Sequence, residues 1–173
     1  MASVVLALAA VGTLVGGLSV DRFVLRGGGT LGRRIMGGVA FFSASALLGC
    51  ALRMRDPWVA AGLTALSCLS AQATQPLWWS CAIGISGRHV GALFGLMNML
   101  GVFGAMSSQY LVGAIADGMG ARGFSGREQW DPIFFIDVGV LACAGWLWAR
   151  FRFVAVEDPE APLGTGTPRP END

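Results

Sequence analysis

Lysine is absent from this 173-residue sequence, and all 12 basic residues are arginines. Charged residues of either sign make up only 13% of the chain, whereas a soluble domain usually has about a quarter. The net charge is +1, so there is no overall field that would attract nucleic acid. The shortage of charge therefore argues against a soluble domain and against a nucleic-acid-binding protein.

Side chains that carry catalysis or hold metals are also scarce. The single histidine, His89, follows Arg88, and we expect it in a solvated loop. Gly27–Gly29 lacks the Lys and Ser/Thr that complete a phosphate-binding loop, and we interpret it as a flexible loop. The cysteines have no C-x-x-C spacing and are interpreted as small packing residues: Cys50, Cys68, Cys81 and Cys143. The sequence predicts no enzyme, no metal site and no cofactor.

Long apolar stretches are what the sequence has in abundance. Hydrophobic residues make up 54% of it, and the mean hydropathy is +0.59. A membrane-spanning helix needs about 20 apolar residues, whereas a barrel strand needs about half as many and alternates with polar ones. We therefore predict an all-α integral membrane protein of about five transmembrane helices, at residues 2–18, 35–52, 58–83, 90–116 and 132–149.

The two ends of the chain differ from its middle. Met1 lies almost inside the first apolar stretch, and neither a basic region nor a clear cleavage motif marks that stretch as a signal peptide. This start suggests a truncated chain, a misplaced start or a split gene. Residues 154–173 are polar and rich in proline, glycine and threonine, so we expect a disordered cytoplasmic tail.

Arginines near the ends of the stretches predict the orientation, because cytoplasmic loops hold more of them. One side has Arg22, Arg26, Arg33, Arg34, Arg88, Arg150 and Arg152. The other side has Arg53, Arg55, Arg122 and Arg127. The chain is thus expected in the cell membrane with its N-terminus outside and its C-terminus in the cytoplasm.

The fourth stretch has one small and polar face. Gly91, Gly95, Asn98 and Gln109 fall on it at 100° per residue. The two glycines form a small-xxx-small step, which predicts helix packing. The amides are costly in lipid, so they either bond to another helix or bind a substrate. The sequence leaves both open.

The third stretch has a comparable face with Gln72, Gln75 and Trp79, and Pro76 is expected to kink it. Gln75 and Asn98 lie on either side of the short turn between the third and fourth stretches. At 1.5 Å per residue each is roughly 12–14 Å from that turn, near the membrane midplane. Two antiparallel helices would let these amides converge on one ligand, at the depth typical of transporter substrates.

The last stretch has two acidic residues and a proline at or near its start. Asp131 and Pro132 suggest an N-cap followed by a first-turn proline. Asp137 is the one acid inside a stretch. If the helix starts at Pro132, Asp137 lies close to the outer interface, where we expect an interfacial or structural role.

Two motifs resemble those of the major facilitator superfamily. Gly17, Asp21 and Arg22, followed by Gly32-Arg33-Arg34, resemble its G-x-x-x-D-R…G-R-R/K loop signature, split here by an insert. Gln75-Pro76-Leu77-Trp78-Trp79 and the segment Gly87–Asn98 are similar to the tenth and eleventh helices of its anion:cation symporter branch. The resemblance covers about Val5 to Phe151 and implies the C-terminal part of the fold, helices eight to twelve.

The resemblance also implies a function. It suggests part of a proton- or cation-coupled carrier of a small organic anion such as a sugar acid, completed by a missing N-terminal half. It implies substrate contacts at Gln75, Asn98, Gln72 and Trp79. It further implies that Gly17, Asp21, Arg22 and Arg33 stabilise an inward-face gate, the alternative being charge that only sets topology. The competing hypothesis is a non-transporting remnant or a helix-bundle interaction protein.

Overall fold

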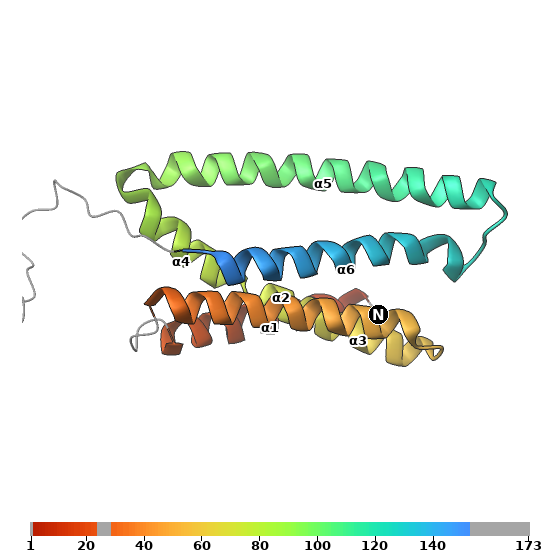
Figure 1. Ribbon diagram of the computed structural model, residues 1–173, viewed down its shortest axis with the longest axis horizontal. Coiled ribbons are helices and arrows are strands. Elements are labelled where there is room, and N and C mark those ends of the chain that lie inside the picture. Colours follow the sequence, from red (N-terminus) through yellow and green to blue (C-terminus); the bar gives the residue numbers. More distant parts are fainter. Residues whose placement is uncertain (1, 24–28, 153–173) are drawn as a thin grey trace, which may run out of the picture.

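The computed structural model describes residues 2–23 and 29–152, and every regular element in these ranges is a helix (Figure 1). The elements are α1 (Ala2–Phe23), α2 (Gly29–Arg53), α3 (Pro57–Gln72), α4 (Gln75–Ser86), the 3₁₀ turn η2 (Gly87–His89), α5 (Val90–Ala121) and α6 (Arg127–Arg150). The predicted all-α class is confirmed. The predicted tail at 154–173 lies outside the described residues.

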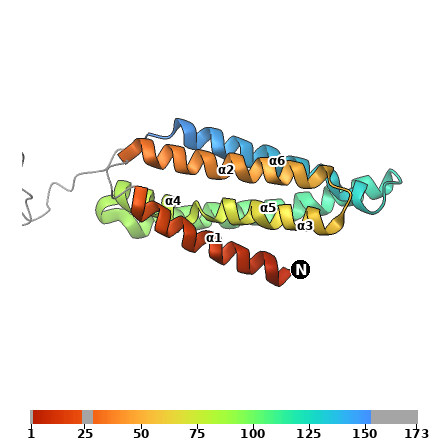
Figure 2. The same ribbon diagram turned by 90° about the horizontal axis from the view of Figure 1, so that it is seen from below.

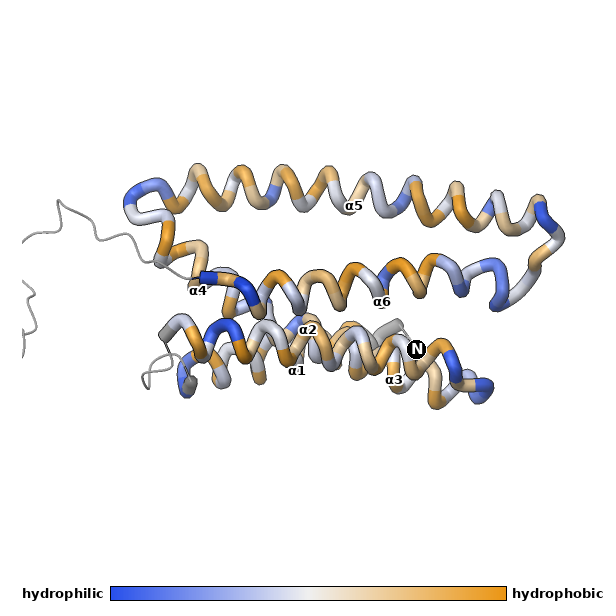
Figure 3. The backbone as a smooth tube through the Cα atoms, viewed as in Figure 1, coloured by the Kyte–Doolittle hydropathy of each residue, from blue (hydrophilic) through white to orange (hydrophobic). Residues whose placement is uncertain are grey.

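Three helical stretches in the described ranges are long and apolar enough to cross a membrane, where the sequence predicted about five. They are Thr30–Arg53, Pro57–Ala121 and Arg127–Arg150, and the second contains α3, α4 and α5. Hydrophobic residues run along the whole length of α5 and α6. Hydrophilic ones gather at the helix ends, and a few stand singly within the two helices (Figure 3). This distribution is the one expected of helices whose middles face an apolar environment.

The helices form a bundle with one outlying member. The long α2 packs against both α3 and α6, and α1 lies on α3 (Figures 1 and 2). The longest helix, α5, runs beside α6 at a distance from the rest (Figure 1). Ala116 is the buried residue of α5. The bundle of α1, α2, α3 and α6 is therefore closely packed, whereas α5 is largely exposed.

Glycines allow α1 to approach α3 closely. A Cβ atom on Gly12 would lie 3.0 Å from Leu69 Cα, and one on Gly16 would lie 2.7 Å from the Ala73 carbonyl carbon. The sequence assigned such a small-xxx-small contact to Gly91 and Gly95 instead. No described atom lies within 4 Å of a Cβ on either of those two. Among the described residues no other helix approaches α5 at these two positions, so the packing role of Gly91 and Gly95 stays a prediction.

The antiparallel pair α2 and α6 is held at both ends by arginines. Arg34, in the first turns of α2, donates from Nε to the Ala149 carbonyl at 2.8 Å. At the other end, Arg127 donates from Nη2 to the carbonyls of Leu52 at 2.5 Å and Ala51 at 3.1 Å. The last carbonyls of a helix have no partner within the helix. Each helix thus supplies an arginine that caps the C-terminal carbonyls of the other.

The predicted third span is broken into α3 and α4. Asp56 caps α3 by accepting a hydrogen bond from Trp58 N at 2.8 Å, and Pro57 occupies its first turn. The helix ends at Gln72 because Pro76, four residues later, has no N–H to donate to its carbonyl. The chain therefore turns at residues 73–74 where the sequence predicted a kink at Pro76, and α4 restarts with that proline in its first turn.

The predicted start of the last helix is wrong. α6 begins at Arg127 after Gly126, whose φ of 65° favours glycine, and Pro132 lies inside the helix. Asp131 is not the N-cap; it forms an ion pair with Arg127 at 3.4 Å. The earlier start puts Asp137 about 15 Å along α6, near its middle. The expected place of Asp137 near the end of the helix is therefore wrong.

Buried serines join the helices of the bundle. Ser67 on α3 is 4% exposed and donates from Oγ to the Ala44 carbonyl of α2 at 2.7 Å. Ser45 of α2 donates to the Val138 carbonyl of α6 at 2.9 Å. Hydrogen bonds of this kind stabilise membrane helices by about 0.6 kcal/mol on average.

We expect Ser67→Ala to destabilise the chain by about 0.5–1.5 kcal/mol, because it removes the bond to Ala44. Thermal unfolding of the chain in mild detergent measures the effect. Thr64→Ala is the matched control, since the Thr64 hydroxyl bonds within its own helix to Ala60 at 2.9 Å. An equal loss in the two variants would contradict a role for Ser67 between helices.

Candidate functional site

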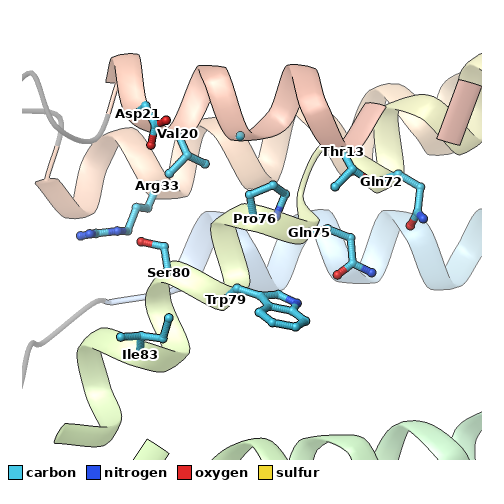
Figure 4. A pocket seen from close by; sticks show the side chains of 11 residues that line it. Thr13, Val20, Asp21, Arg33, Gln72, Gln75, Pro76, Trp79, Ser80 and Ile83 are labelled. Carbon is cyan, nitrogen blue, oxygen red and sulfur yellow. The ribbon is translucent and has the colours of Figure 1, made fainter. Parts of the chain in front are cut away.

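A cavity of about 760 Å³ lies between the C-terminal part of α1, the start of α2, the end of α3 and all of α4 (Figure 4). Its lining combines opposite charges, amides, hydroxyls and apolar groups: Thr13, Gly17, Val20, Asp21, Arg33, Gln72, Gln75, Pro76, Trp79, Ser80 and Ile83. Among these, Gln72, Gln75, Trp79, Gly17, Asp21 and Arg33 were predicted from the sequence as substrate or gate residues. The cavity thus brings together residues that the sequence analysis had placed in two separate motifs.

The polar groups divide the cavity into two ends. Asp21, Arg33 and Ser80 gather at one end in Figure 4, and Gln72 and Gln75 lie at the other. Pro76 and Trp79 line the middle. A ligand that fills this cavity would therefore meet charge at one end, amides at the other and an apolar wall between them.

Gln75 is oriented by a neighbour. Trp78 donates from its indole N–H to Oε1 of Gln75 at 3.0 Å. The amide oxygen is thus already engaged, which fixes the amide so that its NH₂ group remains the donor side. Gln72 makes no side-chain hydrogen bond within the described residues. The amide end of the cavity therefore offers N–H donors to an oxygen-bearing ligand.

Aromatic rings support the middle of the cavity. The Trp79 ring is 5.6 Å from that of Trp78 and 5.1 Å from that of Phe94, centroid to centroid. Phe94 also lies 6.3 Å from Trp78, so α4 and the first turns of α5 share one aromatic cluster. Trp79 remains 50% exposed, which leaves much of its indole face available to a ligand.

The predicted loop signature lies on helices. Gly17, Asp21 and Arg22 are in the second half of α1, and Arg33 is in the first turns of α2. Asp21 and Arg33 both line the cavity. Arg22 is exposed and is not among the lining residues. The prediction of a loop over residues 17–22 was wrong, because α1 continues to Phe23.

The structure does not bring Asn98 to the cavity. Asn98 and Gln109 lie on the exposed α5, and neither is a lining residue. The predicted convergence of Gln75 and Asn98 required one long third helix packed along the fourth. Since α4 is short and meets α5 near η2, the two amides do not share this cavity. Any part that Asn98 takes in binding stays a prediction.

The sequence analysis missed Thr13, Val20, Ser80 and Ile83. A signal for them was present in the spacing. The lining residues of α3 and α4 stand at 72, 75, 76, 79, 80 and 83, the i, i+3, i+4 pattern of one helix face. Those of α1 stand at 13, 17, 20 and 21, with the same pattern. Extending the face of the predicted residues in both directions would have found the others.

Comparisons of the chain with protein-family models, with curated proteins and with solved structures find no match.

Proposed function

We propose that this chain is part of a secondary carrier that moves a small organic anion, such as a sugar acid, across the cell membrane. The observation that carries the proposal is the cavity, in which Gln72, Gln75, Trp79 and Arg33 line one space. Amides suit hydroxyl and carboxylate oxygens, and a guanidinium suits a carboxylate.

The setting of the cavity supports a transport role. The helices that form it belong to stretches apolar enough to cross a membrane, apart from α1. Intramembrane polar groups are costly and mark substrate paths. The two lining charges are kept near helix ends, since Asp21 lies in the last turn of α1 and Arg33 in the first turns of α2. A charged entrance that leads to amides deeper along the helices is the arrangement a carrier of anions requires.

The carrier needs a second body of helices. Alternating access works by rocking two repeats about a central site. The cavity is open, as the 50% exposure of Trp79 indicates, and α5 buries little of its surface. We propose that an N-terminal transporter half completes the cavity and covers α5. Coupling to protons or other cations is part of the same proposal and rests on the family resemblance.

Binding of gluconate to the chain in lipid nanodiscs tests the proposed site, with tryptophan fluorescence as the readout and Trp79→Phe to assign the signal. Gln72→Leu and Gln75→Leu are each expected to weaken binding by about 10-fold or more, because each removes a donor to a charged or hydroxylated ligand. Gln109→Leu makes the same chemical change outside the cavity and serves as the control. Equal affinities in all four proteins would refute the site.

A second candidate function is a helix-bundle interaction protein that transports nothing. The exposure of α5 favours it, because large apolar side chains such as Phe103, Met106 and Tyr110 are 61–79% exposed. Uptake of labelled gluconate into vesicles distinguishes the two. We compare the chain alone with the chain joined to the sequence encoded upstream. Uptake by the joined form supports the carrier, and its absence in a folded joined form supports the alternative.

A further inference from the structure

Two open grooves lie on either side of one ridge of α2. The first, of about 440 Å³, is formed by α1, α2 and α3, and the second, of about 330 Å³, by α2 and α6. Ile35 and Val39 line both grooves and are 56% and 63% exposed, so these two side chains form the ridge between them. The grooves are therefore neighbours on one surface of the bundle and are separate from the cavity described above.

The lining of the first groove is apolar. No charged residue lines it among the described residues. Two of its serines, Ser19 and Ser43, donate to the carbonyls of Val15 and Ala40 in their own helices at 2.7 Å and 2.9 Å. Their hydroxyls are thus already satisfied and need no polar ligand. An apolar occupant suits this groove.

Each groove has the depth of one membrane leaflet. The lining residues of α2 run from Gly32 to Ser43 in the first groove and from Leu31 to Phe42 in the second. Either stretch rises about 16 Å at 1.5 Å per residue, and one leaflet supplies about 15 Å of the hydrocarbon core. A helix about 10 Å wide would rest on the ridge and leave both grooves empty. Two acyl chains joined at one end fit the pair of grooves, with one chain on each side.

The end of the grooves near the start of α2 is basic. Arg34 lines the second groove, and it bonds to the uncharged carbonyl of Ala149 through two nitrogens, which leaves its charge and further N–H donors available. Arg150 follows and lies 5.0 Å from the centroid of the Trp146 ring. The start of α2 and the end of α6 lie at the same end of the bundle (Figure 1). A phosphate group at this end can accept charge-assisted hydrogen bonds.

We infer that the two grooves bind one anionic phospholipid with two acyl chains. Its phosphate lies beside Arg34 and Arg150, and its chains lie on either side of the ridge of Ile35 and Val39. Basic pockets between membrane helices on the cytoplasmic side bind anionic headgroups in this way, and the arginine count predicted that side for this end. The lipid contacts α1, α2, α3 and α6 at once, so it stabilises the bundle. The inference does not depend on the substrate proposed above.

Three lipids that differ by one feature at a time test the inference. They are dioleoyl phosphatidylglycerol, dioleoyl phosphatidylcholine, whose choline cancels the negative charge, and oleoyl lysophosphatidylglycerol, which has one chain. Each is titrated into the delipidated chain in mild detergent, with native mass spectrometry and thermal unfolding as readouts. Phosphatidylglycerol is expected to bind about 10-fold or more tightly than either of the others and to raise the melting temperature most. Equal affinity for phosphatidylglycerol and either other lipid overturns the inference.

A variant that fills the first groove tests where the second chain lies. Ala40→Phe places a ring in that groove and is expected to remove the preference for phosphatidylglycerol over its one-chain form. Ala46→Phe makes the same change at an exposed position of α2 that lines neither groove, and is the control. Ser70→Leu, which narrows the groove from α3, replaces Ala40→Phe if circular dichroism shows that the latter is unfolded. A folded groove variant that keeps the full preference overturns the inference.

A second variant tests the headgroup. Arg150→Gln is expected to lower the preference for phosphatidylglycerol over phosphatidylcholine by about 5-fold, because one arginine near an anionic lipid surface contributes about that factor. It is chosen over Arg34, whose loss also loosens α2 from α6. Arg122→Gln removes an exposed charge at the end of α5 and should leave the preference unchanged. An unchanged preference in Arg150→Gln, or an equal fall in both variants, contradicts a headgroup site at this end of the grooves.

Discussion

Gly16→Val is expected to abolish the packing of α1 on α3. A Cβ at this position would lie 2.7 Å and 2.8 Å from the carbonyl carbon and Cα of Ala73. These are backbone atoms, so no side-chain rotation relieves the collision, and the helices must separate. Overpacking a core usually costs about 1–3 kcal/mol. With the backbone as the obstacle, we expect a loss of about 3 kcal/mol or more.

Two measurements test whether the packing of α1 on α3 is lost. Thermal unfolding of the chain in mild detergent reports the stability, and gluconate binding reports the cavity, because α1 forms one of its walls. The expected result is a large fall in the melting temperature together with loss of binding. Gly12→Val should act in the same direction, since its Cβ would lie 3.0 Å from both the carbonyl carbon and the Cα of Leu69.

Gly95→Val is the matched control. It makes the same substitution in a helix, and no described atom lies within 4 Å of its Cβ. Glycine in a helix is itself unfavourable by roughly 0.5–1 kcal/mol relative to alanine. The control is therefore expected to be neutral or slightly stabilising. A loss in Gly95→Val as large as that in Gly16→Val would show that the close approach at Gly16 is not the cause.

The two pairs of glycines show what residue spacing can predict and what it cannot. Gly12 and Gly16 have the same four-residue spacing as Gly91 and Gly95, and the sequence analysis selected only the second pair. Spacing shows that a helix can be approached closely, but it does not show which helix approaches. That choice depends on how α1 meets α3 in space, which local pattern does not encode. The helical class followed from long apolar stretches, which need no such information.

Only part of the cavity was predictable from the sequence. Gln72, Gln75 and Trp79 share a face because they are close in sequence, and the turn at residues 73–74 leaves that face intact. Asn98 is separated from them by η2, so its position depends on how α5 leaves the turn. Arg33 was interpreted as part of a gate loop. Its presence in the cavity depends on where the start of α2 lies in space relative to α1 and α4, which only the three-dimensional arrangement shows.

Loss of both Arg34 and Arg127 is expected to release α2 from α6. Arg34 bonds to the carbonyl of Ala149, and Arg127 bonds to those of Ala51, Leu52 and Met54. A hydrogen bond to a charged group contributes about 1.5–3 kcal/mol when buried. The Arg127 side chain is 46% exposed, so we expect each single change to Gln to cost about 1–2 kcal/mol.

The two contributions are expected to add. From Arg34 to the carbonyls that Arg127 caps, α2 rises by about 27 Å, and changes more than about 10 Å apart usually add within 0.5 kcal/mol. The double variant should therefore lose about 2–4 kcal/mol in thermal unfolding. Arg122→Gln is the control, because its exposed side chain makes no hydrogen bond within the described residues. A double variant no less stable than either single one would mean that the two ends do not cap independently.

The start of α2 carries Arg33 as well as Arg34, so a loosened start of α2 should also weaken binding of a carboxylate. Arg127→Gln alone acts at the far end of α2 and should leave that binding unchanged.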